Sequence, residues 1–478
     1  MFGVGVGVRV GGTAGGSIDA QAQAHYNRVI ADGGVVPAGV SGVNGFFNAV
    51  KTIYATSDIT TAISVGLDAH YLGYKLGAGS GATSGQAAQK LYSCAGSSGD
   101  VVQTTAASQP LLLAHNGASS DNYYYAPGVS GNYISTTSTY QTDDWDVEFN
   151  VKGKYSLSNG RIAGTRSTSD GTNVAIDGTG ITFEYKIGVI TYAASASTTN
   201  TNDVEYTVRV TRNSATGAVT FIKNGVTLTT SGSQIAGTLS SNSYAIEING
   251  VLGGVQGFSG NINWVKFYIS GSVVRYFNPA TYNASTSQTQ WTSTTGEVWT
   301  INTGTATTGY KGALVDRTIT MFDGVDDFTQ NATVLRGNVC SQYFAYKTEN
   351  ALPNGYAILD GASSNYSNAF TPESTNMKLY MDSSVSGLSK TLGTTLALFT
   401  ATNNQGVLNT LQRNNDTQVS NAYTPALSGT GITIGKLAVA SNYQKGNVNT
   451  YLSAKSADNA TTRTAIYNYI RTINNNAF

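Results

Sequence analysis

Three carboxylates occupy alternate positions in the segment Asp144-Trp145-Asp146-Val147-Glu148. Every second side chain of an extended strand points to the same face, so Asp144, Asp146 and Glu148 should lie together. Two carboxyl groups held about 5–5.5 Å apart can hydrolyse a glycosidic bond with retention. The alternative is an ordinary strand, beginning after a turn, with its polar face toward solvent. We predict the ordinary strand and no enzyme activity, and keep these three as the candidate catalytic residues.

A second acidic group, Asp323, Asp326 and Asp327, surrounds Gly324. Calcium takes about six to eight oxygen ligands, so three carboxylates need backbone carbonyls and Asp360 to complete a site. In the alternative interpretation, Asp323 and Gly324 form a turn while the other two residues solvate the edge of a strand. We expect no metal and no other cofactor, with calcium at Asp323, Asp326 and Asp327 as the alternative.

The histidine and cysteine residues have no catalytic or metal-ligating partners nearby in the sequence. His25, His70 and His115 are far apart, and no local signature of Ser-His-Asp or Cys-His catalysis accompanies them. Cys94 and Cys340 lack metal-ligand spacing and fall in different predicted domains. We therefore expect two free thiols in a reducing compartment.

Composition excludes several partners. Lys and Arg number 27, Asp and Glu also number 27, and charged residues make up only 11% of the chain, against about 25% in an average protein. No run of basic residues could neutralise several phosphates, so we expect no nucleic-acid partner. No apolar stretch approaches about 18 residues, so we expect no membrane insertion. The short apolar start, interrupted by Arg9, does not resemble a secretory signal.

Hydrophobic patterning predicts a short helical part followed by many strands. Helices are expected over 17–31, with Ser17 as N-cap, and over about 41–54, with an apolar stripe. Residues 1–12 alternate Gly and Val as one extended strand. From about residue 105 the pattern is β, and Asn224-Gly225 predicts a hairpin turn because both positions favour positive φ. Many short strands with regular turns are typical of sandwiches.

Landmarks of the first β part recur in the second. Residues 126–133 parallel 322–328, and Gly260-Asn261-Ile262-Asn263 parallels Gly446-Asn447-Val448-Asn449. Because the order is kept, we predict a duplicated domain. The expected division is an N-terminal anchoring region with short helices over 1–104, a first β-sandwich over 105–284 and a second over 285–478.

The ordered motifs resemble a known family. The segments that resemble strands and hairpins of laminin-G/concanavalin-A-like domains are Phe322–Phe328, Asp143–Lys152, Arg209–Phe221 and Gly257–Ile262. With further segments, most of residues 18–478 resembles bacteriophage virion proteins: Phe46–Tyr54, Gln103–Pro110 and Phe277–Pro279 with Trp291 and Trp299. The resemblance implies a mostly β fold of two tandem concanavalin-A-like sandwiches (jelly rolls) after a small, partly helical region.

The resemblance also implies a function. We expect a structural component of a phage particle, such as a capsid decoration, head fibre or tail protein, assembled in the host cytoplasm. Its partners would be other virion proteins and further copies of itself, with a trimer by analogy with fibres. One alternative is an adhesin that binds host surface glycans. The other is a glucanase-like depolymerase, in which Asp144 would stand where the nucleophilic Glu of concanavalin-A-like glucanases lies.

Overall fold

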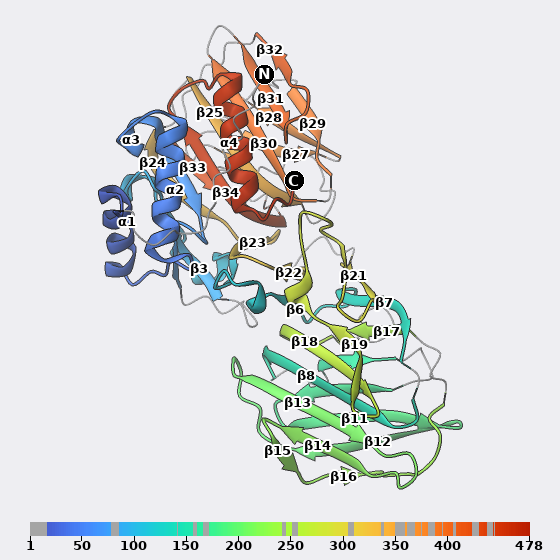
Figure 1. The fold of residues 1–478 in the computed structure, drawn as a ribbon. Coiled ribbons are helices and arrows are strands. Elements are labelled where there is room, and N and C mark those ends of the chain that lie inside the picture. The colour runs from blue at the N-terminus through green and yellow to red at the C-terminus, as the bar shows by residue number, and fades with distance from the viewer. Residues whose placement is uncertain are drawn as a thin grey trace.

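The computed structural model describes residues 17–77, 86–140, 142–155, 160–165, 172–240, 245–250, 257–304, 310–335, 339–348, 359–360, 369–373, 375–380, 388–393, 395–404, 408–422, 430–436, 443 and 445–478. The strand predicted over residues 1–12 lies outside them. The described chain is mostly β and folds into two antiparallel sandwiches, which confirms the predicted fold class. Figure 1 shows the two bodies one above the other.

The lower body, which we call the inserted sandwich, is formed by residues 123–302 together with β22. Its sheet I has the order β15 (Val226–Leu228), β14 (Val219–Lys223), β13 (Glu205–Arg212), β8 (Trp145–Gly153), β18 (Ser259–Ile269), β6 (Tyr123–Pro127) and β22 (Ala313–Val315), with β19 (Ser272–Phe277) also on β18. Its sheet II has the order β16 (Ser231–Gly232), β12 (Ile190–Ser197), β11 (Gly180–Ile187), β10 (Asn173–Asp177), β9 (Gly160–Gly164), β17 (Ala245–Ile248), β7 (Tyr133–Thr139), β21 (Val298–Asn302) and β20 (Gln290–Thr292). Alternate apolar side chains of both sheets, such as Val147, Phe149 and Phe183, form one core between them.

The upper body, which we call the larger sandwich, joins strands from both ends of the chain. Sheet III contains β2 (Tyr74–Leu76), β3 (Gln86–Leu91), β4 (Val101–Val102), β24 (Thr329–Leu335), β33 (Thr430–Ile434), β26 (Leu359–Asp360), β27 (Ala369–Glu373), β28 (Asn376–Tyr380) and β29 (Leu388–Thr391). Sheet IV contains β5 (Leu111–Leu113), β23 (Ile319–Asp323), β1 (Ile63–Asp68), β34 (Lys445–Ala454), β25 (Val339–Thr348), β30 (Ala397–Asn404), β31 (Asn409–Arg413) and β32 (Val419–Asn421). Strand β3 pairs into both sheets.

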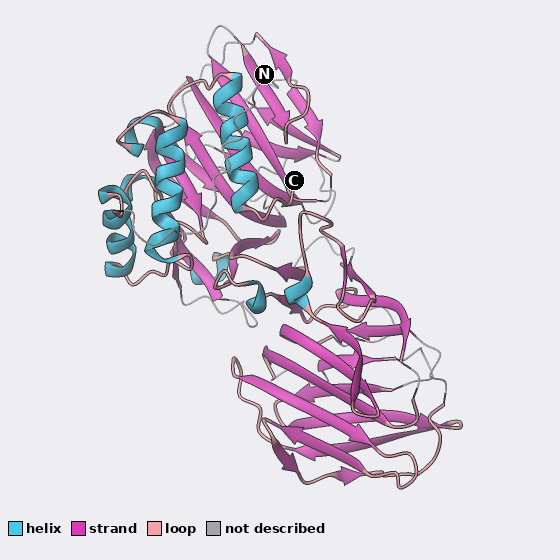
Figure 2. Cartoon of the chain, viewed as in Figure 1, coloured by secondary structure: helices cyan, strands magenta, loops and turns pink. Residues whose placement is uncertain are grey.

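Helices α2 (Gly39–Ile53) and α4 (Ala460–Ile473) cover the outer face of sheet IV (Figure 2). Helix α1 (Ala20–Ala31) lies beside α2, and the short α3 (Ile59–Ala62) leads into β1. Phe46, Phe47 and Ile470 pack against Tyr343 and Leu452, which point outward from the sheet. The predicted helices therefore exist, but the N-cap of α1 is Asp19 and not Ser17, because the Asp19 carboxylate accepts the backbone N–H groups of Gln21 and Ala22.

Strand pairing divides the chain differently from the predicted boundaries at 104 and 284. Strands β1 to β5, from residues 63–113, complete sheets III and IV instead of forming a separate N-terminal region. Strands β20 and β21 pair onto β7, so Trp291 and Trp299 belong to the core of the inserted sandwich. The inserted sandwich thus interrupts the larger one, because β5 and β23 are neighbours in one sheet but lie on either side of it in sequence.

The two bodies are copies in strand order. In one, β18 pairs with β6 and β8; in the other, β34 pairs with β23 and β25. Gly260 and Gly446, which the sequence comparison aligned, stand at the same point of these triplets. A Cβ atom at Gly260 would overlap the carbonyl oxygen of Lys152, and one at Gly446 would lie 2.5 Å from that of Lys347. The predicted duplication is thus visible in the structure, because both copies need a residue without a side chain at the same point of the strand triplet.

A buried ion pair fastens the two ends of the larger sandwich. Asp68 on β1 and Arg317, just before β23, lie 2.7 Å apart with almost no exposed side-chain surface. The Thr450 hydroxyl also donates to Asp68, and Arg317 donates to the Ile473 carbonyl. A buried charge is tolerated only with such partners, so this pair fixes β1, β34 and the end of α4 together.

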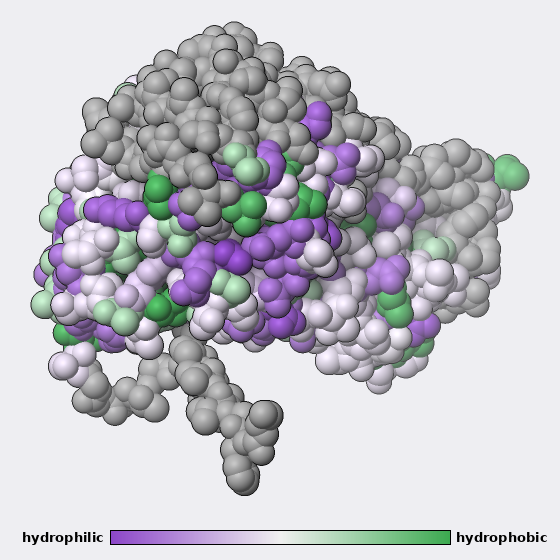
Figure 3. Space-filling view, turned by 90° about the horizontal axis from the view of Figure 1, so that it is seen from above, coloured by the Kyte–Doolittle hydropathy of each residue, from purple (hydrophilic) through white to green (hydrophobic). Residues whose placement is uncertain are grey.

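The face seen from above has a mixed character in its described part. Seen from above in Figure 3, apolar residues of the described part are scattered among polar ones. None of the described helices has the length and apolar character needed to cross a membrane.

Candidate functional site

The acidic triplet does not form one free face. Asp144 is exposed and precedes β8, and its carboxylate accepts the Ser214 backbone N–H at 2.6 Å. This hydrogen bond is the main reason why the pKa of Asp144 is lowered. Asp146 and Glu148 do point outward from β8, as predicted for an ordinary strand.

Both carboxylates on β8 are held by neighbouring strands. Asp146 accepts two hydrogen bonds from the Arg209 guanidinium, at 2.8 and 2.7 Å. Glu148 accepts the Tyr268 hydroxyl at 2.7 Å, and Arg209 lies 4.6 Å from the centre of the Tyr268 ring. A retaining hydrolase needs one carboxyl group to keep its proton and the other to attack. Here both carboxylates are engaged by side chains of neighbouring strands, so the arrangement serves cohesion between strands better than acid catalysis.

The second acidic group does come together. Oxygen atoms of Asp323, Asp326 and Asp327 all lie within 4.8 Å of one another, at the end of β23. Asp327 is buried and accepts the Tyr310 hydroxyl at 2.8 Å and the backbone N–H of Asp323 at 3.0 Å. Burial, followed by repulsion from Asp323, raises the pKa of Asp327 to about 8. Oxygen donors of this kind fit a hard cation such as calcium, and a proton on Asp327 relieves the same repulsion. The side chain of Asp360 lies outside the described part.

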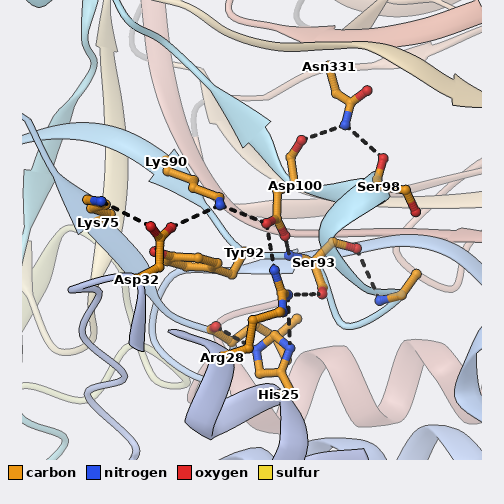
Figure 4. Close-up of polar contacts among 12 residues, drawn as sticks. His25, Arg28, Asp32, Lys75, Lys90, Tyr92, Ser93, Ser98, Asp100 and Asn331 are labelled. Carbon is orange, nitrogen blue, oxygen red and sulfur yellow. Dashed lines mark hydrogen bonds and ion pairs between the residues drawn. The ribbon is translucent and has the colours of Figure 1, made fainter. Parts of the chain in front are cut away.

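Charged residues at α1 form another cluster, drawn in Figure 4. Asp32 is bound by Lys75, Lys90 and the Tyr92 hydroxyl, at 3.1, 3.0 and 2.7 Å. These partners, the Tyr92 hydrogen bond first, lower the pKa of Asp32. Arg28 pairs with Asp100 at 2.6 Å. Because the charges drawn in Figure 4 are paired with one another, the cluster docks α1 onto strands β2 and β3. These paired groups leave no charge for a ligand.

A groove on the outer face of sheet I is better suited to hold a ligand. Its volume is about 310 Å³, within the range of ligand pockets, about 300–1,000 Å³. Its floor presents amide, charged and aromatic side chains from neighbouring strands: Asn150, Lys152, Glu205, Asn261, Asn263 and Trp264. This mixture can bind hydroxyl groups and an apolar ring face at once.

An irregularity in β18 places Trp264 in this groove. The register between β18 and β8 shifts between Ile262 and Trp264, so one extra residue enters the strand. Such a bulge re-aims side chains. As a result Asn263 and Trp264 both border the groove, while Ile262 and Val265 remain in the core. The Lys266 ammonium lies 4.4 Å from the Trp264 ring centre and supports its orientation.

Hydrogen bonds fix the amides and carboxylate of the floor. Asn150 donates to Glu205 and to the Thr207 hydroxyl, both at 2.9 Å, and accepts from the amide of Asn263. Asn150 is itself buried. Its amide group is therefore used to orient Glu205 and Asn263, whose remaining oxygen atoms can face a ligand.

The wall of the groove comes from the segment that connects the two sandwiches, residues 114–122. His115 holds this segment in shape: its Nδ1 accepts the Gly117 N–H and its Nε2 donates to Asn122, both at 2.9 Å. The Asn122 amide donates to the Pro279 carbonyl, and the His115 N–H donates to the Thr318 hydroxyl. The wall is thus fastened to both bodies.

Sequence reasoning missed this groove. Asn261 and Asn263 were only landmarks of the duplication, and the wall lies far from them in sequence. The tyrosine run at residues 123–125 does not supply a stacking surface, because Tyr124 and Tyr125 are fully buried in β6. Tyr123 is 6% exposed and only borders the groove.

Comparisons with known proteins do not assign this chain to a family. No family model matches the sequence, and no curated protein does. Among solved structures, domains LG4–5 of the mouse laminin α1 chain align over 74% of this chain and 96% of theirs, at 11% identity and a TM-score of 0.30. A putative carbohydrate-binding protein from Bacteroides ovatus aligns over 41% of this chain and 60% of its own, at 16% identity and a TM-score of 0.29. Scores this low support no conclusion about a ligand, so the fold assignment rests on the strand pairing above.

Proposed function

We propose that this protein is a non-catalytic carbohydrate-binding protein and that the groove on sheet I holds the glycan. The observation that carries the proposal is the bulge in β18, which brings the Trp264 ring beside amide and carboxylate groups. The apolar face of a sugar ring packs on an aromatic side chain, while its hydroxyl groups bind polar side chains around it. Asn263 and Glu205 supply such groups.

The absence of catalysis is part of the proposal. Asp146 is paired with Arg209, and Glu148 accepts the Tyr268 hydroxyl. Neither carboxylate lines the groove. We therefore expect bound glycan to be released unchanged, and prolonged incubation with purified protein should leave oligosaccharides intact by mass spectrometry. Hydrolysis that disappears in Asp146→Ala or Glu148→Ala would favour the depolymerase instead.

We further propose that the protein performs this role on a bacteriophage particle, as a decoration, head-fibre or tail subunit that assembles with itself. The support is the ordered set of motifs in the sequence that resembles virion proteins. Antibody labelling of intact particles viewed by electron microscopy tests this placement. Particles that contain none of the chain would refute the virion role while leaving glycan binding open.

The binding proposal is tested with the full chain on a broad glycan array, followed by calorimetry with the oligosaccharide found. Trp264→Ala should weaken binding at least about tenfold, since a central aromatic contact usually dominates recognition. Tyr133→Ala is the matched control, because Tyr133 is a partly exposed aromatic residue on sheet II. Failure of the wild type to bind any glycan would refute the proposal, as would unchanged binding by Trp264→Ala.

A further inference from the structure

The charges around the groove restrict which glycan it can accept. The floor contributes the Lys152 ammonium and the Glu205 carboxylate, and the wall contributes the Asp121 carboxylate. His115 adds no charge at neutral pH, since burial lowers its pKa and its ring nitrogens are already hydrogen-bonded in the neutral form. Among the described lining residues, two negative charges therefore face one positive charge, while the Lys266 ammonium lies outside the lining and on the Trp264 ring.

The groove also lacks the group best suited to an acidic sugar. Carboxylate and sulfate groups are bound most strongly by the planar fork of arginine. No arginine is among the described lining residues. On the same face of sheet I, the Arg209 fork is already engaged by both oxygens of Asp146 and stacks on Tyr268.

Uncharged sugars, in contrast, match what the groove offers. Glu205 uses Oε1 to accept the Asn150 amide, and its Oε2 can accept a hydroxyl group of a ligand. Asn116 on the wall and Asn263 on the floor carry both donors and acceptors. A hydroxyl or acetamido group can pair with these side chains, whereas a sugar carboxylate would face Glu205 and Asp121, with Lys152 as the one cation among the described lining residues.

We infer that the groove binds an uncharged glycan and that Glu205 and Asp121 exclude sialylated, uronic and sulfated sugars. This inference rests on the proposed function, because it names the ligand class of the same groove. Asp121 acts by repulsion from the exposed wall, while Glu205 also binds hydroxyl groups. Specificity thus depends on a residue from the connection between the sandwiches as well as on the sheet.

The test compares each neutral oligosaccharide that binds with its sialylated or uronic counterpart, using the full chain in calorimetry at low salt. The neutral member should bind at least about tenfold more tightly. Asp121→Lys should reduce this preference, and the gain for the acidic sugar should fade at high salt because the interaction is screened. Asp144→Lys makes the same charge change at an exposed position outside the groove and should leave the preference as in wild type.

The outcomes separate the two proposals. Wild-type protein that prefers the acidic sugar would overturn the inference but keep the glycan-binding function. Equal preference in Asp121→Lys and wild type would overturn the role of Asp121. Wild-type protein that binds neither member of any pair would overturn the proposed function itself. Thermal unfolding of each variant shows whether a loss reflects folding.

Discussion

At the scale of single residues, the polar side chains of the described chain fall into two groups: those bound by other protein side chains and those that line the groove. Asp146, Glu148 and Asp32 are bound by neighbouring side chains, and their spacing in the sequence did not indicate which groups these would be. Glu205 and Asn263, in contrast, line the groove. The difference arises from cross-strand neighbours, which are set by register and not by local sequence.

Asp327 yields a pH prediction at this scale. Its pKa is raised to about 8 in the folded protein, whereas an unfolded chain has the ordinary value near 4. Between these values the folded state retains a proton that the unfolded state loses, so stability falls as pH rises from about 4 to about 8, by up to about 1.4 kcal/mol per pH unit. Asp327→Asn removes the charge and keeps an acceptor for Tyr310.

We therefore expect Asp327→Asn to melt at a higher temperature than wild type at pH 8 and at a similar temperature at pH 4, by scanning calorimetry. The buried histidines contribute equally to both proteins and cancel in the difference. A melting difference that does not change with pH would contradict the prediction. Calcium at pH 8 tests the metal alternative: if the cluster binds it, the melting temperature of wild type should rise more than that of Asp327→Asn.

At the scale of elements, the same strand triplet is used twice and needs glycine at the same place. Gly260 on β18 and Gly446 on β34 both pass close to the backbone of the neighbouring central strand. The surrounding side chains differ: Phe258 lies beside the first and Tyr346 beside the second. The two copies therefore share the backbone requirement, while the buried side chains that pack beside it differ.

Substitution of either glycine should destabilise its own sandwich. Gly260→Ala and Gly446→Ala each force a Cβ atom against a backbone carbonyl, which we expect to cost about 1–3 kcal/mol or more. Gly45→Ala in α2 is the control, because nothing lies within 4 Å of its added Cβ atom and alanine favours helix. Thermal unfolding followed by near-ultraviolet circular dichroism measures each change. An unchanged melting temperature in both variants would contradict the prediction, because it would show that the neighbouring strands accommodate the added Cβ atoms without loss of stability.

At the scale of the whole molecule, one sandwich is nested in the other. Leu111 and Leu113 on β5 share a small core with Tyr123 and Tyr125 on β6 at the junction. The Gln288 side chain also bonds to Leu396 and Ala477 across the two bodies. The groove wall crosses the same junction, so the shape of the proposed binding site depends on both bodies.

Nesting predicts how fragments behave. A fragment of residues 122–316 contains all strands of sheets I and II and should fold with a cooperative thermal transition. Residues 285–478 lack β1 to β5, so β23, β24 and β34 lose neighbours, and this fragment should not fold. Residues 105–284 lack Trp291 and Trp299 and should be several kcal/mol less stable than 122–316. Cooperative unfolding of 285–478 would contradict the nested arrangement.

The sequence by itself determined the elements that depend on local or periodic signals. The Asn224-Gly225 turn has positive φ at both residues, as predicted, and Val147, Phe149 and Val151 face the core as their alternation requires. The duplication was also visible, because Gly260 and Gly446 are required by close backbone contact in each copy.

Tertiary structure alone decided which strands are neighbours and where a site forms. Strand β1 pairs with β34, which brings residues 63–68 beside residues 450–454. No local sequence pattern specifies a partner so far away, because the edge of a strand offers similar hydrogen bonds to many other strands. The groove likewise joins Asp121 on the wall to Glu205 and Trp264 on the floor. The acidic residues conspicuous in the sequence were instead satisfied by Arg209, Tyr268 and Tyr310, whose positions only the fold supplies.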